Sequence, residues 1–167
     1  QLFEFAKAMG LENIVSEPNE KDIPMLSKLC DQYKINIAIH DHPKPSHYWN
    51  PDILLAAIKG ASPRIGACAD IGHWTRSGLD PLECVKKLEG HIKEFHFKDL
   101  NEKSPEAHDV PWGTGVNNVA AIMEEMKRQH FHGPVSAEYE YNWDNNVPDV
   151  TKSAAFFNEE ADKPANK

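Results

Sequence analysis

The nine residues GACADIGHW, from Gly66 to Trp74, run from an apolar strand directly into ionisable side chains. The first part of this stretch is small and apolar, as in a strand that is covered on both faces. Asp70 and His73 then follow, three residues apart, with Gly72 between them. Because ionisable side chains are seldom buried without a partner or a function, this stretch predicts a buried strand that ends at a functional edge of a sheet.

The same alternation of strand and helix recurs along the rest of the chain. Apolar runs that predict strands begin at Ile14, Ile37, Ile65, Ile92 and Val135. A segment with helical spacing of apolar residues follows each of them. Strands that alternate with helices and are apolar on both faces predict an α/β fold with a parallel sheet and helical crossovers.

Each of the five predicted strands ends in ionisable side chains. These are Glu17, then His40 with Asp41 and His42, then Asp70 with His73, then His96 with Lys98 and Asp99, and last Glu138 with Glu140. In a (β/α)₈ barrel the carboxyl ends of all strands converge on one mouth, whereas the outermost strands of an open sheet end far apart. A curved, barrel-like sheet therefore accounts for these residues better than an open one.

The length predicts only part of such a barrel. Eight units typically take ~250 residues, so a chain of 167 residues has room for five units. We expect a partial (β/α)₈ TIM barrel of five C-terminal β/α units, with residues 1–160 as an incomplete barrel domain and 161–167 as a flexible tail. Because a complete barrel has eight units, we expect three units to precede Gln1, which itself stands within a helical pattern. Unpaired apolar edges of this kind favour a homo-oligomer or aggregation.

Composition narrows the classes of partner and compartment. The formal net charge of -8 argues against nucleic acid as a partner, since surfaces that follow phosphates are basic. No apolar run approaches the ~18 residues that a membrane span needs, so no membrane association is expected. Cys30, Cys68 and Cys84 fall in predicted helix or strand interiors, which favours reduced core cysteines and a cytoplasmic protein.

Several motifs together resemble the later part of the xylose-isomerase-like barrels, the sugar phosphate isomerase and epimerase superfamily. They are IVSEP, AIHDHP, GACADIGHW, EFHFKDL, HDVPWGTG and GPVSAEYEYNWDNNVPDV, in this order over nearly the whole chain. The resemblance implies a divalent metal held by Glu17, Asp70, His96 and Glu138, with His73 in the same mouth. Three carboxylates and one imidazole suit Mn²⁺, Mg²⁺ or Co²⁺, with Zn²⁺ possible.

The resemblance implies a divalent-metal-dependent sugar isomerase or epimerase acting on a small sugar or keto-sugar. The metal would polarise a carbonyl and stabilise an enediolate, while Glu17 and Glu138 act as base and acid at the neighbouring carbon. Three alternatives stay open. They are a keto-sugar or inosose lyase or dehydratase at the same site, a metal-dependent endonuclease, and a non-catalytic fragment. The acidic charge disfavours the endonuclease.

Five further residues are candidates for substrate binding, namely His73, His40, His108, Lys98 and Trp112. His73 either donates a hydrogen bond to the substrate or orients a metal ligand. Lys98 either contacts a substrate oxyanion or forms a pair with Asp99. His108 and Trp112 are candidates for a lid, because an aromatic face packs well on a sugar ring.

Two features also have a purely structural interpretation. An acid at a strand end, such as Asp70, is often the N-cap of the next helix. The glycines Gly113 and Gly115 allow a tight turn that could hold an anion, although a single Gly-x-Gly is weak support for it. We expect the combination of ligand-type residues on successive strands to outweigh the capping role.

Overall fold

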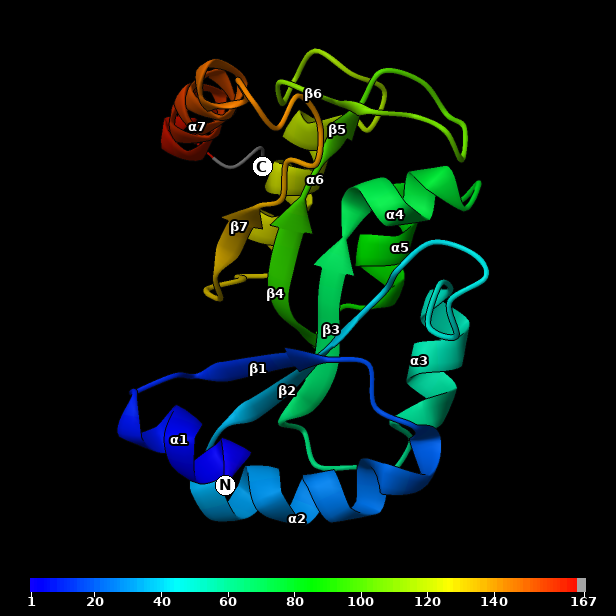
Figure 1. Cartoon of the computed structure of the whole chain (residues 1–167), viewed down its shortest axis with the longest axis vertical. Coiled ribbons are helices and arrows are strands. Elements are labelled where there is room, and N and C mark those ends of the chain that lie inside the picture. Colours follow the sequence, from blue (N-terminus) through cyan, green and yellow to red (C-terminus); the bar gives the residue numbers. More distant parts are fainter. Residues whose placement is uncertain (165–167) are drawn as a thin grey trace.

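The computed structural model describes residues 1–164, and its centre is a parallel sheet of five strands. The strands are β1 (Asn13–Ser16), β2 (Asn36–His40), β3 (Ile65–Asp70), β4 (Ile92–Phe97) and β7 (Val135–Ala137). They lie side by side in chain order, and the sheet curves into a half-barrel (Figure 1). The predicted α/β fold and partial barrel are confirmed. Parallel neighbours that follow one another in sequence require a crossover at each step.

Helices lie around the outside of the curved sheet (Figure 1). They are α1 (Leu2–Ala8), the 3₁₀ helix η1 (Glu20–Asp22), α2 (Ile23–Tyr33), α3 (Pro51–Ala57), α4 (Ile71–Arg76), α5 (Pro81–Lys87), α6 (Val119–Arg128) and α7 (Val147–Asp162). Asp80 caps α5, and its Oδ1 accepts hydrogen bonds from the backbone of Leu82 at 2.9 Å and Glu83 at 3.2 Å. An acid directly before a proline at the first helical position is a common start of a helix, and it fixes the first turn of α5.

The sequence does not predict two of the short elements. Helix α4 begins directly after β3, so the residues that follow Asp70 turn at once into a helix. Strands β5 (Asp99–Leu100) and β6 (Asp109–Val110) form an antiparallel pair just after β4. Both elements stand at the carboxyl ends of the sheet, where they narrow the space above the strands.

The hydrophobic core lies between the sheet and its helices. Every residue of β3 is buried, so this central strand anchors the core. Trp112 also belongs to the core, because it is 6% exposed and its ring packs 5.3 Å from that of Phe97 and 6.1 Å from that of Phe157. This position corrects the expectation that Trp112 is part of a substrate-facing lid.

The two outer strands of the sheet, β1 and β7, each pair on one side within residues 1–164. Helix α7 continues to Asp162, so the first two residues of the predicted tail are helical. Residues 165–167 of that tail lie outside the described residues. Among the described helices, none has the length and apolarity needed to cross a bilayer.

Candidate metal centre

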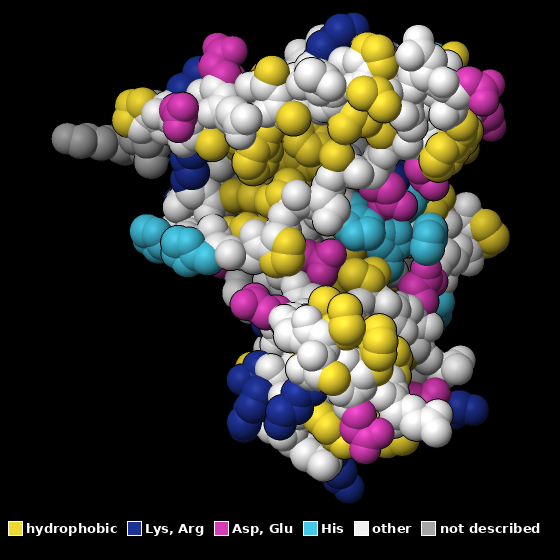
Figure 2. All heavy atoms as spheres, turned by 60° about the vertical axis from the view of Figure 1, so that its left-hand side comes forward, with side chains coloured by type: hydrophobic (Ala, Val, Ile, Leu, Met, Phe, Trp, Pro, Cys, Tyr) yellow, Lys and Arg dark blue, Asp and Glu magenta, His cyan; other side chains and the backbone are white. Residues whose placement is uncertain are grey.

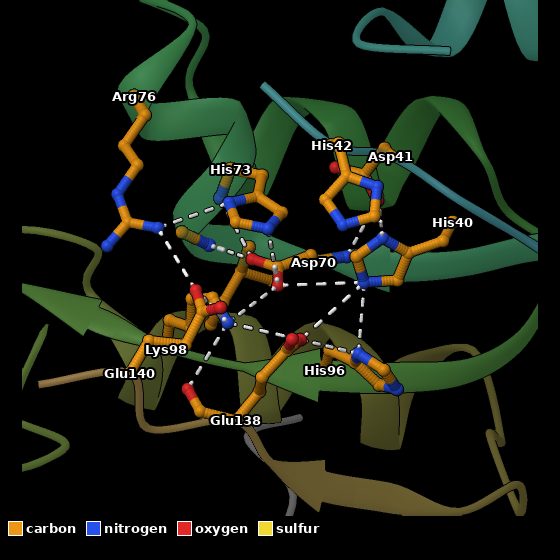
Figure 3. A network of polar contacts seen from close by, with 12 residues as sticks. His40, Asp41, His42, Asp70, His73, Arg76, His96, Lys98, Glu138 and Glu140 are labelled. Carbon is orange, nitrogen blue, oxygen red and sulfur yellow. Dashed lines mark hydrogen bonds and ion pairs between the residues drawn. The ribbon is translucent and has the colours of Figure 1, made fainter. Parts of the chain in front are cut away.

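Four side chains from four different strand ends converge at the carboxyl edge of the sheet. They are His40, Asp70, His96 and Glu138, and one ligand atom of each lies within 4.8 Å of the others. Asp70 and His96 are direct partners in the register of β3 and β4, and His40 and Glu138 stand at the ends of their neighbours. Figure 2 shows histidine and acidic side chains gathered in a hollow, and Figure 3 shows them pointing toward one another.

His96 lies at the centre of this group. Its Nδ1 is 2.6 Å from Glu138 Oε2 and 3.0 Å from His40 Nε2. Burial lowers the pKa of His96, but its contacts with Glu138 and Glu94 outweigh burial and raise the pKa to about 9. For Glu138, hydrogen bonds with His40 and His96 outweigh burial and hold the carboxyl pKa far below its usual range. Glu138 is therefore ionised at neutral pH.

The two carboxylate oxygens of Asp70 have different surroundings, one at the start of α4 and the other in the candidate site. Oδ1 accepts hydrogen bonds from the backbone of Gly72 and His73, each at 2.9 Å, and so caps α4. Oδ2 is buried and accepts no hydrogen bond from any of residues 1–164. Burial raises the pKa of Asp70 to about 6, against the lowering effect of Lys98. The capping role and the ligand role, which the sequence presents as alternatives, are compatible because different oxygens serve them.

Gly72 explains the glycine in the opening stretch. A Cβ at this position would lie 2.6 Å from the Cβ of Lys98, which is well inside contact distance. The side chain of Lys98 therefore passes directly over the first turn of α4. Only glycine leaves the space that this lysine needs to reach the end of β3.

Lys98 is fully buried and pairs with carboxylates rather than facing the surface. Its Nζ lies 3.3 Å from Asp70 Oδ2, 3.1 Å from Glu138 Oε2 and 3.1 Å from Glu140 Oε2. Burial lowers the pKa of the ammonium, but these three carboxylates raise it by more. The ion-pair partners of Lys98 are therefore Asp70, Glu138 and Glu140 rather than Asp99.

Asp99 fills the turn that the sequence offers to an anion. Its Oδ2 accepts hydrogen bonds from the backbone of Gly113 and Gly115, each at 2.9 Å. Its Oδ1 accepts further ones from Leu100 at 3.0 Å and Asn117 at 3.1 Å. The anion in the Gly-x-Gly turn is therefore a carboxylate of the protein itself, and the turn fixes the loop after β5.

His73 is held by a charged neighbour on α4. Its Nδ1 lies 3.3 Å from Arg76 Nη1, and its Nε2 lies 3.5 Å from Asp70 Oδ2. Because a guanidinium only donates hydrogen bonds, Nδ1 must accept, and Nε2 carries the proton. Burial, together with the positive charges of Lys98 and Arg76, lowers the pKa of His73 to about 2. His73 is therefore a neutral N–H donor aimed into the site.

Glu17 stands beside the converging group rather than within it. It pairs with His42, and its Oε2 accepts a hydrogen bond of 2.9 Å from Ser46 Oγ. Glu17, His42 and Glu138 nevertheless line one cavity of about 300 Å³ together with His40 and His96. His40, rather than Glu17, is the fourth side chain of the converging group.

His108 lies on the loop between β5 and β6, away from the four converging side chains. Its ring stacks on Tyr141 with centroids 4.3 Å apart, and it is half-buried. This contact joins the β5–β6 loop to the segment after β7. The position leaves His108 as a candidate for the rim of the site.

Sequence reasoning missed two charged residues around the site, Glu94 and Arg76, and it gave Asp41 a place at a strand end but no role. The carboxylate of Asp41 accepts a hydrogen bond of 2.7 Å from the Asp70 backbone, and burial with the charge of Asp70 raises the pKa of Asp41 well above its usual range. Glu94 stands two residues before His96. The period of two in a strand places both on one face, and this signal was available in the sequence.

The residues present suit a divalent cation. The Oδ2 of buried Asp70 accepts no hydrogen bond within residues 1–164, and it lies 3.9 Å from His40 Nε2 and 3.3 Å from its ion-pair partner Lys98. Two imidazoles and two carboxylates are a ligand set for Zn²⁺, Co²⁺ or Mn²⁺, and are less suited to Mg²⁺, which prefers oxygen.

A curved parallel sheet with ligand-type side chains at its carboxyl ends defines a barrel protein with a candidate metal site. The chain belongs to the xylose isomerase-like TIM barrel family, whose sequence profile it matches over residues 21–160. No sequence among curated proteins matches it.

Solved structures give the same fold. An uncharacterised protein from Parabacteroides distasonis is 36% identical, with a TM-score of 0.68 over 95% of this chain and 62% of that one. A D-tagatose 3-epimerase-like protein is 23% identical, with a TM-score of 0.79 over 95% of this chain and 65% of that one. The IOLI protein, solved with a zinc atom, is 17% identical, with a TM-score of 0.68 over 96% and 66% of the chains. The chain therefore spans about two thirds of the length of these structures.

Proposed function

We propose that the protein is a divalent-metal-dependent sugar isomerase or epimerase that moves a proton at the carbon beside a carbonyl group. The observation that carries this proposal is the convergence of His40, Asp70, His96 and Glu138 within 4.8 Å, at the carboxyl ends of four parallel strands. In barrels of this kind the active site lies at those ends. The likeness of fold to a D-tagatose 3-epimerase-like protein supports the substrate class.

The four residues would hold the cation, and the cation would polarise a carbonyl oxygen of the bound sugar. Zn²⁺, Co²⁺ and Mn²⁺ are the expected ions, because His40 replaces one of the carboxylates that the resemblance implies. Glu17 is then not one of the four proposed metal ligands. Its carboxyl group lines the cavity instead, where it can contact the substrate.

Glu138 and Glu17 are the groups proposed to move the proton. Both line the cavity of about 300 Å³, Glu17 from the end of β1 and Glu138 from the end of β7. Because these strands are the two outer ones, the carboxylates approach a bound sugar from different walls. One of them, as a carboxylate, takes up the proton from the carbon, and the other, in its protonated form, donates its own proton to the opposite face of that carbon. The size of the cavity is at the lower end for small-molecule sites, which suits a small sugar.

His73 and Lys98 support this chemistry without moving the proton. The Nε2–H of His73 donates a hydrogen bond to an oxygen of the substrate. Lys98, 3.1 Å from Glu138 Oε2, holds that carboxylate in its ionised form. Glu138 thus begins the reaction as a base.

The test is exchange of the hydrogen beside the carbonyl of ketoses and keto-sugars in deuterated water, with the protein loaded with Zn²⁺, Co²⁺ or Mn²⁺. We expect deuterium incorporation by the unmodified protein and a loss of ~10²-fold or more in Glu138→Gln, the usual scale for a general base. A panel without any exchange would overturn the proposal in favour of the non-catalytic alternative. Exchange followed by loss of water would instead identify a lyase or dehydratase.

A further inference from the structure

A series of hydrogen-bonded polar side chains links the amino ends of the strands to Glu94, below the metal centre. We call the edge of the sheet at these amino ends its lower end and the edge at the carboxyl ends its upper end. Arg64 Nη1 donates to Asn36 Oδ1 at 3.3 Å, and Asn36 Nδ2 donates to Asn13 Oδ1 at 2.9 Å. Asn13 Nδ2 then donates to Glu94 Oε2 at 3.0 Å. Each link joins a different strand or strand end. The series ends at Glu94, beneath His96.

Glu94 faces the side of His96 that points away from the metal centre. Its Oε1 lies 3.5 Å from His96 Nε2, while His96 Nδ1 points to Glu138 and His40. Glu94 is buried, at 8% exposure. The hydrogen bond from Asn13 goes to the other oxygen, Oε2, so Oε1 is the oxygen that faces His96.

We propose that Glu94 is a positioning residue for the metal centre, which keeps a proton on His96 Nε2, so that Nδ1 is the nitrogen that gives up its proton and binds the cation. The assignment rests on the proposed metal site but goes beyond it, because Glu94 contacts neither the cation nor the substrate. Asn13 fixes the orientation of Glu94 from below.

The physical reason is that a neutral imidazole carries one proton and has two nitrogens that compete for it. A carboxylate near Nε2 stabilises the proton there, and the lone pair of Nδ1 then faces the metal centre. Carboxylate–imidazole–metal arrangements of this kind also fix the ring orientation and raise the basicity of the ligand. Without Glu94, the proton is free to sit on Nδ1 and block the metal.

The experiment compares Glu94→Gln and Glu94→Leu with the unmodified protein by competition for Zn²⁺ against a chelator. We expect Glu94→Leu to lose about 10- to 100-fold in affinity, the usual cost of an outer partner of a metal-bound histidine. Glu94→Gln keeps an oxygen that can accept the Nε2 proton, so it should lose less. In the Zn²⁺-loaded protein, nitrogen NMR should find the His96 proton on Nε2, and this proton should exchange faster with water in Glu94→Leu.

Glu125 provides the matched control. It is also a buried glutamate, but it pairs with Arg128 and Gln129 on α6, so Glu125→Leu tests the loss of a buried carboxylate elsewhere. The proposal predicts unchanged Zn²⁺ affinity in Glu125→Leu. Equal losses in both leucine variants, or unmodified affinity in Glu94→Leu, would overturn it while the proposed function stands. A protein that binds none of the cations would overturn both.

Discussion

The two ends of the same sheet treat their polar side chains in opposite ways. At the lower end Asn13, Asn36 and Arg64 satisfy one another through hydrogen bonds of 2.9 to 3.3 Å. At the upper end Asp70 Oδ2 is buried without a hydrogen bond, and Lys98 is buried among carboxylates. Since buried polar groups are nearly always satisfied, the exceptions mark places with another purpose. The polar side chains of the lower end stabilise the fold, whereas those of the upper end are arranged as a binding site.

Among variants at the two ends, Asp70→Asn at the upper end should cause the largest loss of Zn²⁺ affinity. The amide oxygen can still cap α4, but the ligand loses its charge, so Zn²⁺ affinity should fall by more than the ~10- to 100-fold typical of outer partners. Chelator competition measures this. Asp80→Asn is the matched control, because Asp80 caps α5 with the same two bonds and faces solvent. Equal affinities for the two variants would contradict the assignment of Asp70.

Metal binding should also expel a proton from the upper end. The pKa of His96 is raised to about 9 in the metal-free protein, so His96 is protonated at pH 7 and must lose that proton to coordinate a cation. We expect release of about one proton per Zn²⁺ at pH 7, falling toward zero as the pH rises above that pKa. Calorimetry in buffers of different ionisation enthalpy gives the number. A binding heat that is independent of the buffer at pH 7 would contradict this.

Gly72→Ala tests the packing that supports the upper end. The added Cβ would lie 2.6 Å from the Cβ of Lys98, and the neighbour on that side is a backbone-attached atom that cannot easily move. Overpacking of this kind costs about 1–3 kcal/mol of unfolding free energy. Urea unfolding should show it as a lower midpoint. An unchanged midpoint would mean that α4 and Lys98 are not held together as described.

The smallest effect on the metal centre should come from the lower end. Asn36→Ala removes two hydrogen bonds, one to Asn13 of β1 and one from Arg64, the residue before β3, and each contributes about 0.5–1.5 kcal/mol. The variant should lose about 1–3 kcal/mol of stability in urea and keep its Zn²⁺ affinity, because the bond from Asn13 to Glu94 and the contact of Glu94 with His96 remain. A tenfold loss of affinity would show that the two ends are not as separate as the comparison states.

Much of the fold was predictable because it follows from local patterns. The apolar runs after Ile14, Ile37, Ile65, Ile92 and Val135 give all five strands of the sheet and their order. The hairpin of β5 and β6 was not predictable, because strands of two residues carry no periodicity. The carboxylate of Asp99 holds this hairpin by accepting hydrogen bonds from the backbone of Gly113 and Gly115, which are more than ten residues away in the sequence.

The site was predictable in part. Asp70, His96 and Glu138 converge as the resemblance implies, but His40 joins them where Glu17 was expected. The sequence alone could not show whether His40 or Glu17 joins the converging group, since each stands at the end of a strand and each is a ligand-type residue. The choice depends on the register of β1 and β2 and on the neighbours of each side chain. Glu17 is taken up by His42 and Ser46 instead.

The most direct test is therefore the Zn²⁺ affinity of His40→Gln against that of Glu17→Gln, measured by chelator competition on the same preparation of the protein. The account predicts a loss of more than ~10²-fold in His40→Gln, because a ligand is removed, and a change of less than about threefold in Glu17→Gln. The opposite ranking, with affinity lost in Glu17→Gln and kept in His40→Gln, would contradict the metal centre described for this half-barrel.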